Sequence, residues 1–501
     1  MLGKLGTVSG LTLLSRIFGF LRDVVLAAAL GAGPVADAFM LAFRLPNHFR
    51  ALLAEGAFNA AFLPGYAALS ASGGPARRFG AEVLGWLLLA NLVLLAVALS
   101  QTGWVLSLLA PGLGAEDPTR ALAITLTRIT FPYLMCMSVV AYLGALLNSR
   151  DRFAATAAAP ILLNLCMLAT LWAAPLFPGV AQAAAVGVTL SGVAQVLLLA
   201  MAATRAGIAL GVAPPRLSPE TRAFFRRLGP AVLAAGALQI SVLADTVLAT
   251  FLPSGSLSTL YYADRLYQLP IGLIGVALGT VLLPDIGRRA GLGDAVGMRR
   301  ALDRAAMVCL ATGLPMAVLM ALLGDWAVEV LFRRGAFDAE AAQASAAILA
   351  AYALGLVPAL SVRSLVAGFH GRGDTRTPLT ALMLAALPNL GLKLALAPVL
   401  GAAGLALATS AGMAVYAGLL WVLSRRRGHA GALPRGRVTG LLGTTAVMAA
   451  AVLALKAPVR AAAEAALPGG ALAAALIALG LLGLALQTAG SALCLRGWHP
   501  A

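Results

Sequence analysis

The chain has 501 residues, of which 61% are hydrophobic and only 11% are charged. A typical soluble domain has about a quarter of its residues charged, so this composition excludes a water-soluble globule and indicates an integral membrane protein. The net charge of +17 would suggest nucleic-acid binding in a soluble chain. In a membrane protein it instead predicts basic cytoplasmic loops and a cavity for an anionic substrate.

Apolar stretches long enough to cross a bilayer follow one another along the whole chain. A bilayer core needs roughly 20 apolar residues per helix. Cuts at charge clusters and Pro/Gly turns leave fourteen stretches, near 7–31, 34–66, 82–109, 119–148, 154–174, 180–204, 228–252, 256–287, 301–323, 340–369, 377–399, 402–424, 438–457 and 470–495. We predict an all-α polytopic membrane protein with about 14 transmembrane helices. The second and eighth stretches are too long for one straight span, and we expect kinks at Pro46 and Pro270.

The basic residues predict the orientation of the chain. With the N-terminus inside, the cytoplasmic loops and helix ends hold 23 Lys and Arg residues. The opposite side then holds five, namely Arg120, Arg333, Arg334, Lys456 and Arg460. The positive-inside rule therefore places both termini in the cytoplasm.

The sequence contains a weak internal duplication with a period of about 222 residues. Pro160-Ile-Leu-Leu-Asn164 resembles Leu387-Pro388-Asn389, and Asp23 falls opposite Asp245. Six spans in each copy predict two parallel six-helix lobes plus two C-terminal helices, an arrangement that typically holds a substrate between the lobes. We predict an N-lobe at 1–206, a cytoplasmic linker at 207–227, a C-lobe at 228–426 and spans thirteen and fourteen at 427–501.

Charged residues at membrane depth cost several kcal/mol on the more lenient scales, about 3 kcal/mol each, so each one requires a reason. Five arginines and three carboxylates in the first six spans indicate a solvated cationic cavity, because a guanidinium binds phosphate oxygens bidentately and stays charged. The alternatives are structural ion pairs, such as Arg22 with Asp23, and arginines that extend to the membrane surface. These charges are Arg16, Arg22, Asp23, Asp37, Arg44, Arg50, Glu55 and Arg128 in the first copy, and Asp245, Asp264, Arg265, Arg363 and Lys393 in the second.

No pattern typical of an enzyme site accompanies these charges. The four histidines and four cysteines lack metal-ligand spacing, and no Gly-rich phosphate loop with a lysine is present. We therefore expect no metal centre of that kind, no cofactor and no ATPase. Transport would depend on an ion gradient, the membrane potential or mass action.

Several short motifs give the chain a recognisable family resemblance. They are Ser15-Arg-Ile-Phe-Gly-Phe-Leu-Arg-Asp23, Asp37-Ala-Phe, Arg44-Leu-Pro-Asn47, Ala54-Glu-Gly-Ala-Phe58, Tyr261-Tyr-Ala-Asp-Arg265 and Gly275-Val-Ala-Leu-Gly-Thr280. Together they resemble the MurJ (MviN) family of lipid II flippases, within the multidrug/oligosaccharidyl-lipid/polysaccharide exporter superfamily. The resemblance extends from the N-terminus to about residue 425. In this family the last two spans border a groove for the lipid tail.

The resemblance implies transport of the undecaprenyl-diphosphate-linked peptidoglycan precursor, lipid II, from the inner to the outer leaflet of the bacterial cytoplasmic membrane. Arg16, Arg22, Arg50 and Arg265 match the cavity arginines that hold the diphosphate. Asp37 and Glu55 match cavity carboxylates, and Asp23, beside Arg22, is assigned to the same substrate site. The implied ligands are lipid II and membrane lipid. Proteins of cell-wall synthesis are candidate partners, and no nucleic-acid partner is expected. The monomer is expected to be functional.

Two other classes of function remain to be distinguished. A cation-coupled drug or polysaccharide exporter of the same superfamily would not require four cavity arginines, and a cationic drug would be repelled by them. A polytopic enzyme acting on polyprenyl phosphates would need paired acids or a metal site near one membrane face. The longest outward loop, near 324–339, contains no such constellation.

A further hypothesis concerns ion coupling. Asp245 could hold a coupling cation, with Asn389 and Thr409 supplying further oxygens. However, Lys393 lies one helical turn after Asn389, and its ammonium could replace the ion and pair with Asp245. The alternative is that Lys393 extends to the membrane surface.

Overall fold

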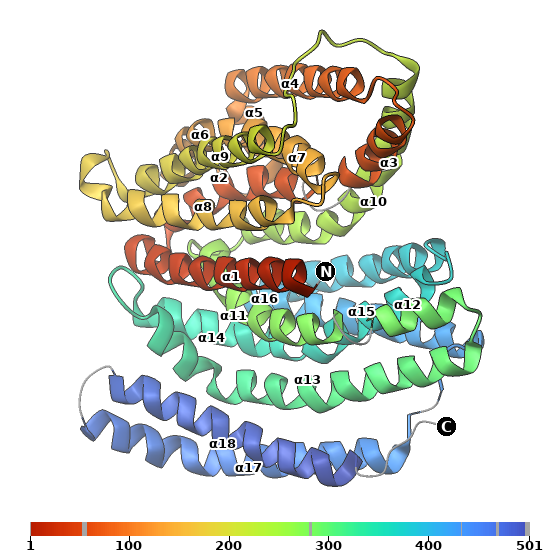
Figure 1. Ribbon diagram of the computed structural model, residues 1–501. Helices are drawn as coiled ribbons and strands as arrows, with labels where there is room; N and C mark the ends of the chain where they lie inside the picture. The colour runs from red at the N-terminus through yellow and green to blue at the C-terminus, as the bar shows by residue number, and fades with distance from the viewer. Residues whose placement is uncertain (1, 53–57, 280–282, 432, 467–469, 496–501) are drawn as a thin grey trace. The chain divides into compact units, whose positions relative to one another are not determined.

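The computed structural model describes residues 2–52, 58–279, 283–431, 433–466 and 470–495, which form helices joined by turns and short loops (Figure 1). Within these ranges there is no strand. The helices are α1 (Leu2–Leu30), α2 (Pro34–Leu52), α3 (Phe58–Ala71), α4 (Ala76–Ser100), α5 (Thr102–Leu109), α6 (Pro118–Thr130), α7 (Pro132–Asn148), α8 (Phe153–Trp172), η2 (Ala174–Leu176), α9 (Val180–Arg205), α10 (Pro219–Ala249), α11 (Ser256–Ala277), α12 (Leu283–Gly291), α13 (Ala295–Phe332), α14 (Ala339–Ala353), α15 (Leu356–His370), α16 (Arg376–Arg426), α17 (Arg435–Ala466) and α18 (Gly470–Leu495).

The order of helices repeats once along the chain. A shift of about 222 residues places α1 on α10, α2 on α11, α3 on α12 and α4 on α13. The adjoining helices α6 and α7 fall on α14 and α15, and α8 and α9 fall on the two halves of α16. Both copies run in the same order and are followed by α17 and α18, which confirms the predicted internal duplication and the two additional C-terminal helices; the predicted lobe bounds stay a prediction.

The two halves of α16 are separated by a single glycine. Gly401 has φ 59° and ψ −138° inside a run of 51 residues that is otherwise helical. A side chain would strain the backbone at that φ, whereas glycine adopts it readily. The predicted spans at 377–399 and 402–424 therefore meet at this residue.

The long second and eighth predicted stretches each correspond to two helices. The chain remains helical through Pro46 in α2 and through Pro270 in α11. The second stretch continues into α3 and the eighth into α12, and residues 53–57 and 280–282 between them lie outside the described part of the chain.

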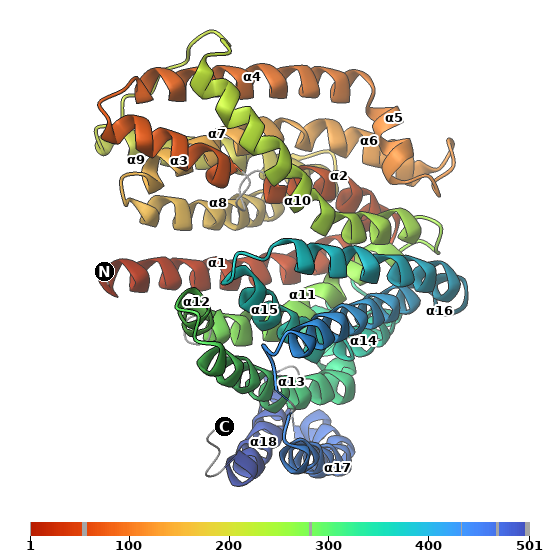
Figure 2. The same ribbon diagram turned by 90° about the vertical axis from the view of Figure 1, so that its right-hand side faces the viewer.

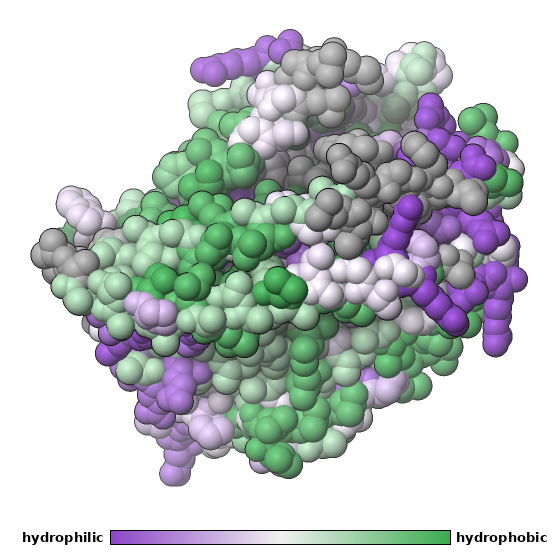
Figure 3. All heavy atoms as spheres, turned by 90° about the horizontal axis from the view of Figure 1, so that it is seen from below, coloured by the Kyte–Doolittle hydropathy of each residue, from purple (hydrophilic) through white to green (hydrophobic). Residues whose placement is uncertain are grey.

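The described helices have the apolar character of membrane spans. Eight are long and apolar enough to cross a bilayer, and α14 with α15, bent by 44° at their junction, would make a ninth. Large apolar side chains point outward from them, for example Leu92 on α4 and Leu197 on α9, which are 56% and 57% exposed. Figure 3 shows hydrophobic residues across the middle of one face, with hydrophilic residues gathered toward its edges. Such a surface suits lipid rather than water.

The chain divides into two compact units, residues 1–258 with 335–337 and residues 259–334 with 338–501. In the first unit, α10 packs against α3 and α4 through an aromatic cluster. The ring of Phe224 lies 5.7 Å from Phe58, 6.3 Å from Phe62 and 6.4 Å from Phe79, measured between centroids. Buried aromatic contacts of this kind stabilise a helix junction beyond their buried area. They explain why α10, which begins the second copy of the repeat, belongs to the first unit.

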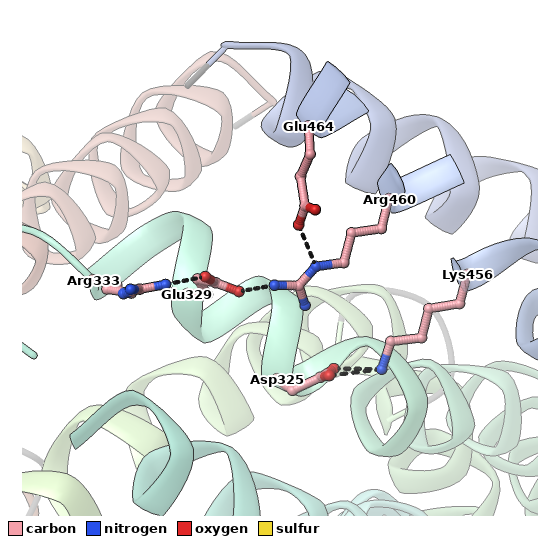
Figure 4. A network of polar contacts seen from close by, with 6 residues as sticks. All are labelled: Asp325, Glu329, Arg333, Lys456, Arg460 and Glu464. Atoms are coloured by element: carbon pink, nitrogen blue, oxygen red, sulfur yellow. Dashed lines mark hydrogen bonds and ion pairs between the residues drawn. The ribbon is translucent and has the colours of Figure 1, made fainter. Parts of the chain in front are cut away.

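In the second unit, α17 and α18 lie side by side (Figures 1 and 2), and α17 contacts α13. Trp326 of α13 is fully buried among Leu323, Met448 and Val452. Ion pairs continue this junction beyond the apolar cluster (Figure 4). We call them the α13–α17 ion pairs: Asp325 with Lys456 at 2.7 Å, Glu329 with Arg333 at 2.5 Å and with Arg460 at 2.6 Å, and Arg460 with Glu464 at 2.9 Å.

Candidate functional site

Two buried charges of the first unit lie on α1, where α8 packs against it. Arg22 and Asp23 are only 6% and 2% exposed. Arg22 Nε and Nη2 donate to Asp23 Oδ1 over 3.0 and 2.6 Å. Arg22 Nη1 donates to Oδ1 of Asn164 on α8 over 3.1 Å, and the Phe43 ring centroid lies 5.9 Å from the guanidinium carbon. The sequence alternative of an Arg22–Asp23 ion pair is therefore present in the structure, and a second helix holds the same guanidinium.

The other arginine of α1 has a different environment. The chain is helical from Leu2 to Leu30, and Arg16 is exposed whereas Arg22 is buried. Six residues on a straight helix correspond to a rotation of about 120° between side chains. Gly19, between the two arginines, lies against the amide of Asn164.

Asp37, at the start of α2, acts as a helix cap. Its two carboxylate oxygens accept hydrogen bonds from the backbone N–H groups of Gly255 and Ser258, at 2.6 and 2.8 Å. These groups lie at the N-terminus of α11, where a carboxylate satisfies free donors and complements the helix dipole. Asp37 also lines a polar pocket of about 210 Å³ with Asp117 and Thr250.

Three further candidate charges of the first half are Arg44, Arg50 and Glu55. Arg44 of α2 donates a hydrogen bond to the Thr246 hydroxyl of α10. The side chain of Arg50 and the whole of Glu55 lie outside the described part of the structure. The predicted roles of these two residues therefore stay predictions.

In the second unit, Arg265 lies on α11 among residues of its own helix. Its Nη2 is 3.8 Å from Asp264 Oδ2, and its guanidinium carbon is 4.6 Å from the Tyr261 ring centroid. Gln268 donates to Asp264 at 2.5 Å. The Arg265 side chain is 30% exposed, so it is more accessible than Arg22.

Three of the four candidates for ion coupling, Asn389, Lys393 and Thr409, lie on α16. Lys393 is only 1% exposed, so its ammonium does not extend to a surface. Asn389 packs against Gly412 of the second half of the helix, where a side chain would collide with it. Thr409, one turn before Gly412, has a buried hydroxyl oxygen without a hydrogen-bond partner among the described residues. Asp245 lies in the first unit, on α10, and its pairing with Lys393 stays a prediction.

The sequence reasoning missed the role of Asn164. The duplication had singled out this residue only as a counterpart of Asn389. A buried asparagine in an apolar helix is itself a signal, since an amide buried away from water requires partners. Which partners it finds depends on the packing of α8 against α1, which the sequence did not reveal.

Comparison with known proteins places this arrangement in a family. The family model described as lipid II flippase MurJ matches residues 26–463. A probable lipid II flippase MurJ of Rhizobium meliloti (strain 1021) is 41% identical over 461 residues, covering 90% of this chain and 85% of its own. A lipid II flippase MurJ of Burkholderia cenocepacia is 34% identical over 436 residues, covering 84% of this chain and 83% of its own.

Solved structures show the same fold. A lipid II flippase MurJ in an inward closed conformation matches with a TM-score of 0.84 at 22% identity, covering 98% of each chain. An inward-facing multidrug resistance transporter of the MATE family, in the MOP superfamily, matches with a TM-score of 0.67 at 16% identity, covering 84% of this chain and 97% of its own. The exporter alternative thus shares the fold, but the family model and the relatives of higher identity are flippases. This chain belongs to the MurJ family of lipid II flippases.

Proposed function

We propose that this protein carries lipid II, the undecaprenyl-diphosphate-linked peptidoglycan precursor, from the inner to the outer leaflet of the bacterial cytoplasmic membrane. It does so as a transporter and not as an enzyme, by alternating access of its two lobes. Both termini lie in the cytoplasm, and the monomer is the working unit. Proteins of cell-wall synthesis are candidate partners.

The single observation that carries this proposal is Arg22, a guanidinium buried in a membrane helix and oriented by two other side chains. Burying an arginine is costly, and replacing a buried ion pair by apolar residues is often neutral or stabilising. Stability therefore does not account for Arg22, whereas binding of an anionic headgroup does. Arg16, Arg50 and Arg265 join it in holding the diphosphate, and Asp23, Asp37 and Glu55 balance their charge.

Ion coupling is the second part of the proposal. Lys393 takes the place of a coupling cation and pairs with Asp245, while Asn389 and Thr409 supply neighbouring polar groups. The burial of Lys393 supports this assignment, because a buried ammonium needs a compensating charge. Transport is then insensitive to sodium.

Complementation of a conditional lipid II flippase mutant tests the flippase proposal. The wild-type chain should restore growth, and Arg265→Ala should fail to do so at normal membrane expression. Arg333→Ala is the matched control, because it removes an arginine of the α13–α17 ion pairs that is outside the proposed cavity, and it should complement. Growth with Arg265→Ala equal to that of the wild type would contradict the proposal that cavity arginines hold the diphosphate.

A further inference from the structure

We infer that Asn164 is a positioning residue for the diphosphate: it sets the plane in which Arg22 presents its guanidinium. This inference rests on the proposed function of Arg22. Asn164 lies on α8, more than one hundred residues from α1 in sequence, and none of the sequence motifs that identify the family includes it.

The amide of Asn164 is held at both ends. Its Oδ1 accepts from Arg22 Nη1 over 3.1 Å, and its Nδ2 donates to the carbonyl oxygen of Ser15 over 3.0 Å. Because the amide nitrogen is tied to the α1 backbone, the amide oxygen must face Arg22. The residue is only 4% exposed, so water does not compete for either bond.

Asp23 and Asn164 contact different edges of the guanidinium. Asp23 Oδ1 accepts from Nε and Nη2, whereas Asn164 Oδ1 accepts from Nη1. An acceptor on Nη1 from a different helix restrains the guanidinium plane further. Bidentate recognition of phosphate oxygens depends on the orientation of that plane. Asn164 supplies this restraint from α8.

The chain offers a matched control in Asn91. This residue is also a buried asparagine of the first unit, on α4. Its Nδ2 donates to Leu87 O over 2.7 Å, and its Oδ1 accepts from the Ser138 hydroxyl over 3.1 Å. Neither of these bonds involves an arginine, so loss of Asn91 removes two similar hydrogen bonds and leaves the groups proposed to hold the diphosphate unchanged.

The test measures the affinity of the purified full-length chain in lipid nanodiscs for undecaprenyl diphosphate, together with the apparent Tm. We expect Asn164→Leu to weaken binding by about tenfold or more and Asn91→Leu to leave it within about twofold, although both lower the Tm. In an Arg22→Gln background, Asn164→Leu should cause no further loss of affinity, because the group it positions is gone. Asn164→Ser, which is small and neutral, removes the acceptor on Arg22 Nη1 without adding a charge. It should also bind weakly, and it provides the measurement if the leucine variant does not fold.

Two results would overturn the inference. One is wild-type affinity in both Asn164 variants while Arg22→Gln loses binding, which would leave the flippase proposal intact. The other is a loss that multiplies in the Arg22→Gln background, which would show that Asn164 acts independently of Arg22. Wild-type affinity of Arg22→Gln itself would instead refute the proposed grip, and with it the role of Asn164.

Discussion

Two groups of charged side chains in this molecule both form ion pairs, but they differ in burial. Arg22 and Asp23 have side chains only 8% and 3% exposed. In the α13–α17 ion pairs, Lys456 and Asp325 are 25% and 49% exposed, and Arg460 and Glu329 are 32% and 26% exposed. The first group lies where α1 packs against α8, and the second lies beside the apolar cluster of Trp326.

The difference in burial predicts different roles for the two groups of ion pairs. An exposed pair contributes about 0–1 kcal/mol, because water and salt screen it. A buried pair contributes little net stability, yet the loss of one partner leaves an uncompensated charge and costs about 3–5 kcal/mol. The buried group is therefore expected to be sensitive and functional, whereas the exposed group orients α17 on α13.

The largest effect is expected at Arg22. Arg22→Ala leaves Asp23 buried without its guanidinium and should destabilise the protein by about 3–5 kcal/mol. Adding Asp23→Asn in the same chain should restore the Tm but not complementation, because the charge is balanced while the grip stays absent. Thermal unfolding and growth of the conditional strain separate the two outcomes. Growth of the double variant would show that the pair is structural.

A second buried charge tests whether this reasoning extends to α16. Lys393→Ala should lower stability by about 3–5 kcal/mol, or impair transport, if Lys393 pairs with a buried carboxylate. Asp245→Asn in the same chain should partly restore what was lost. Sodium-dependent transport by the unmodified protein, or no rescue in the double variant, would contradict the pair.

The exposed group should respond weakly. Lys456→Met removes the contact with Asp325 and should lower stability by about 1 kcal/mol or less. High salt should reduce the difference from wild type, because exposed pairs are screened. Unfolding measured at low and high ionic strength checks both expectations. A loss as large as that of Arg22→Ala would remove the contrast between the two groups.

The smallest effect concerns pH and lies outside the spans, at Asp374 between α15 and α16. Hydrogen bonds from the Thr377 hydroxyl and backbone N–H, with Arg427 nearby, lower the pKa of Asp374 to about 2. A depressed carboxyl pKa stabilises the fold above the unfolded value of about 4, and this contribution fades as pH falls through about 2. The Tm difference between wild type and Asp374→Asn should therefore be larger at pH 6 than at pH 3. An equal difference at both would show that the charge is not involved.

The sequence predicted the helices and the repeat well because both depend on local composition. Apolar length and the spacing of Gly, Pro and charge are enough to find helices such as α9 and the two halves of α16. The presence of Arg22 in a span also indicated a special role. Its orientation could not be predicted, because Asn164 reaches it only through the packing of α8 on α1. Asp37 could not be recognised as a cap for the same reason, since Gly255 and Ser258 follow it by more than two hundred residues.

The aromatic cluster around Phe224 can be completed only after α10 has been synthesised. Phe58, Phe62 and Phe79 enter the membrane long before Phe224, which is the ring that packs against all three. Until α10 has been inserted, the first six spans present these aromatic faces without their final partner. The N-terminal half is then an incomplete folding intermediate, as is common for chains of this size. Ribosomes that stop before α10 should release fragments that quality-control proteases degrade, even though every span of the first lobe is present.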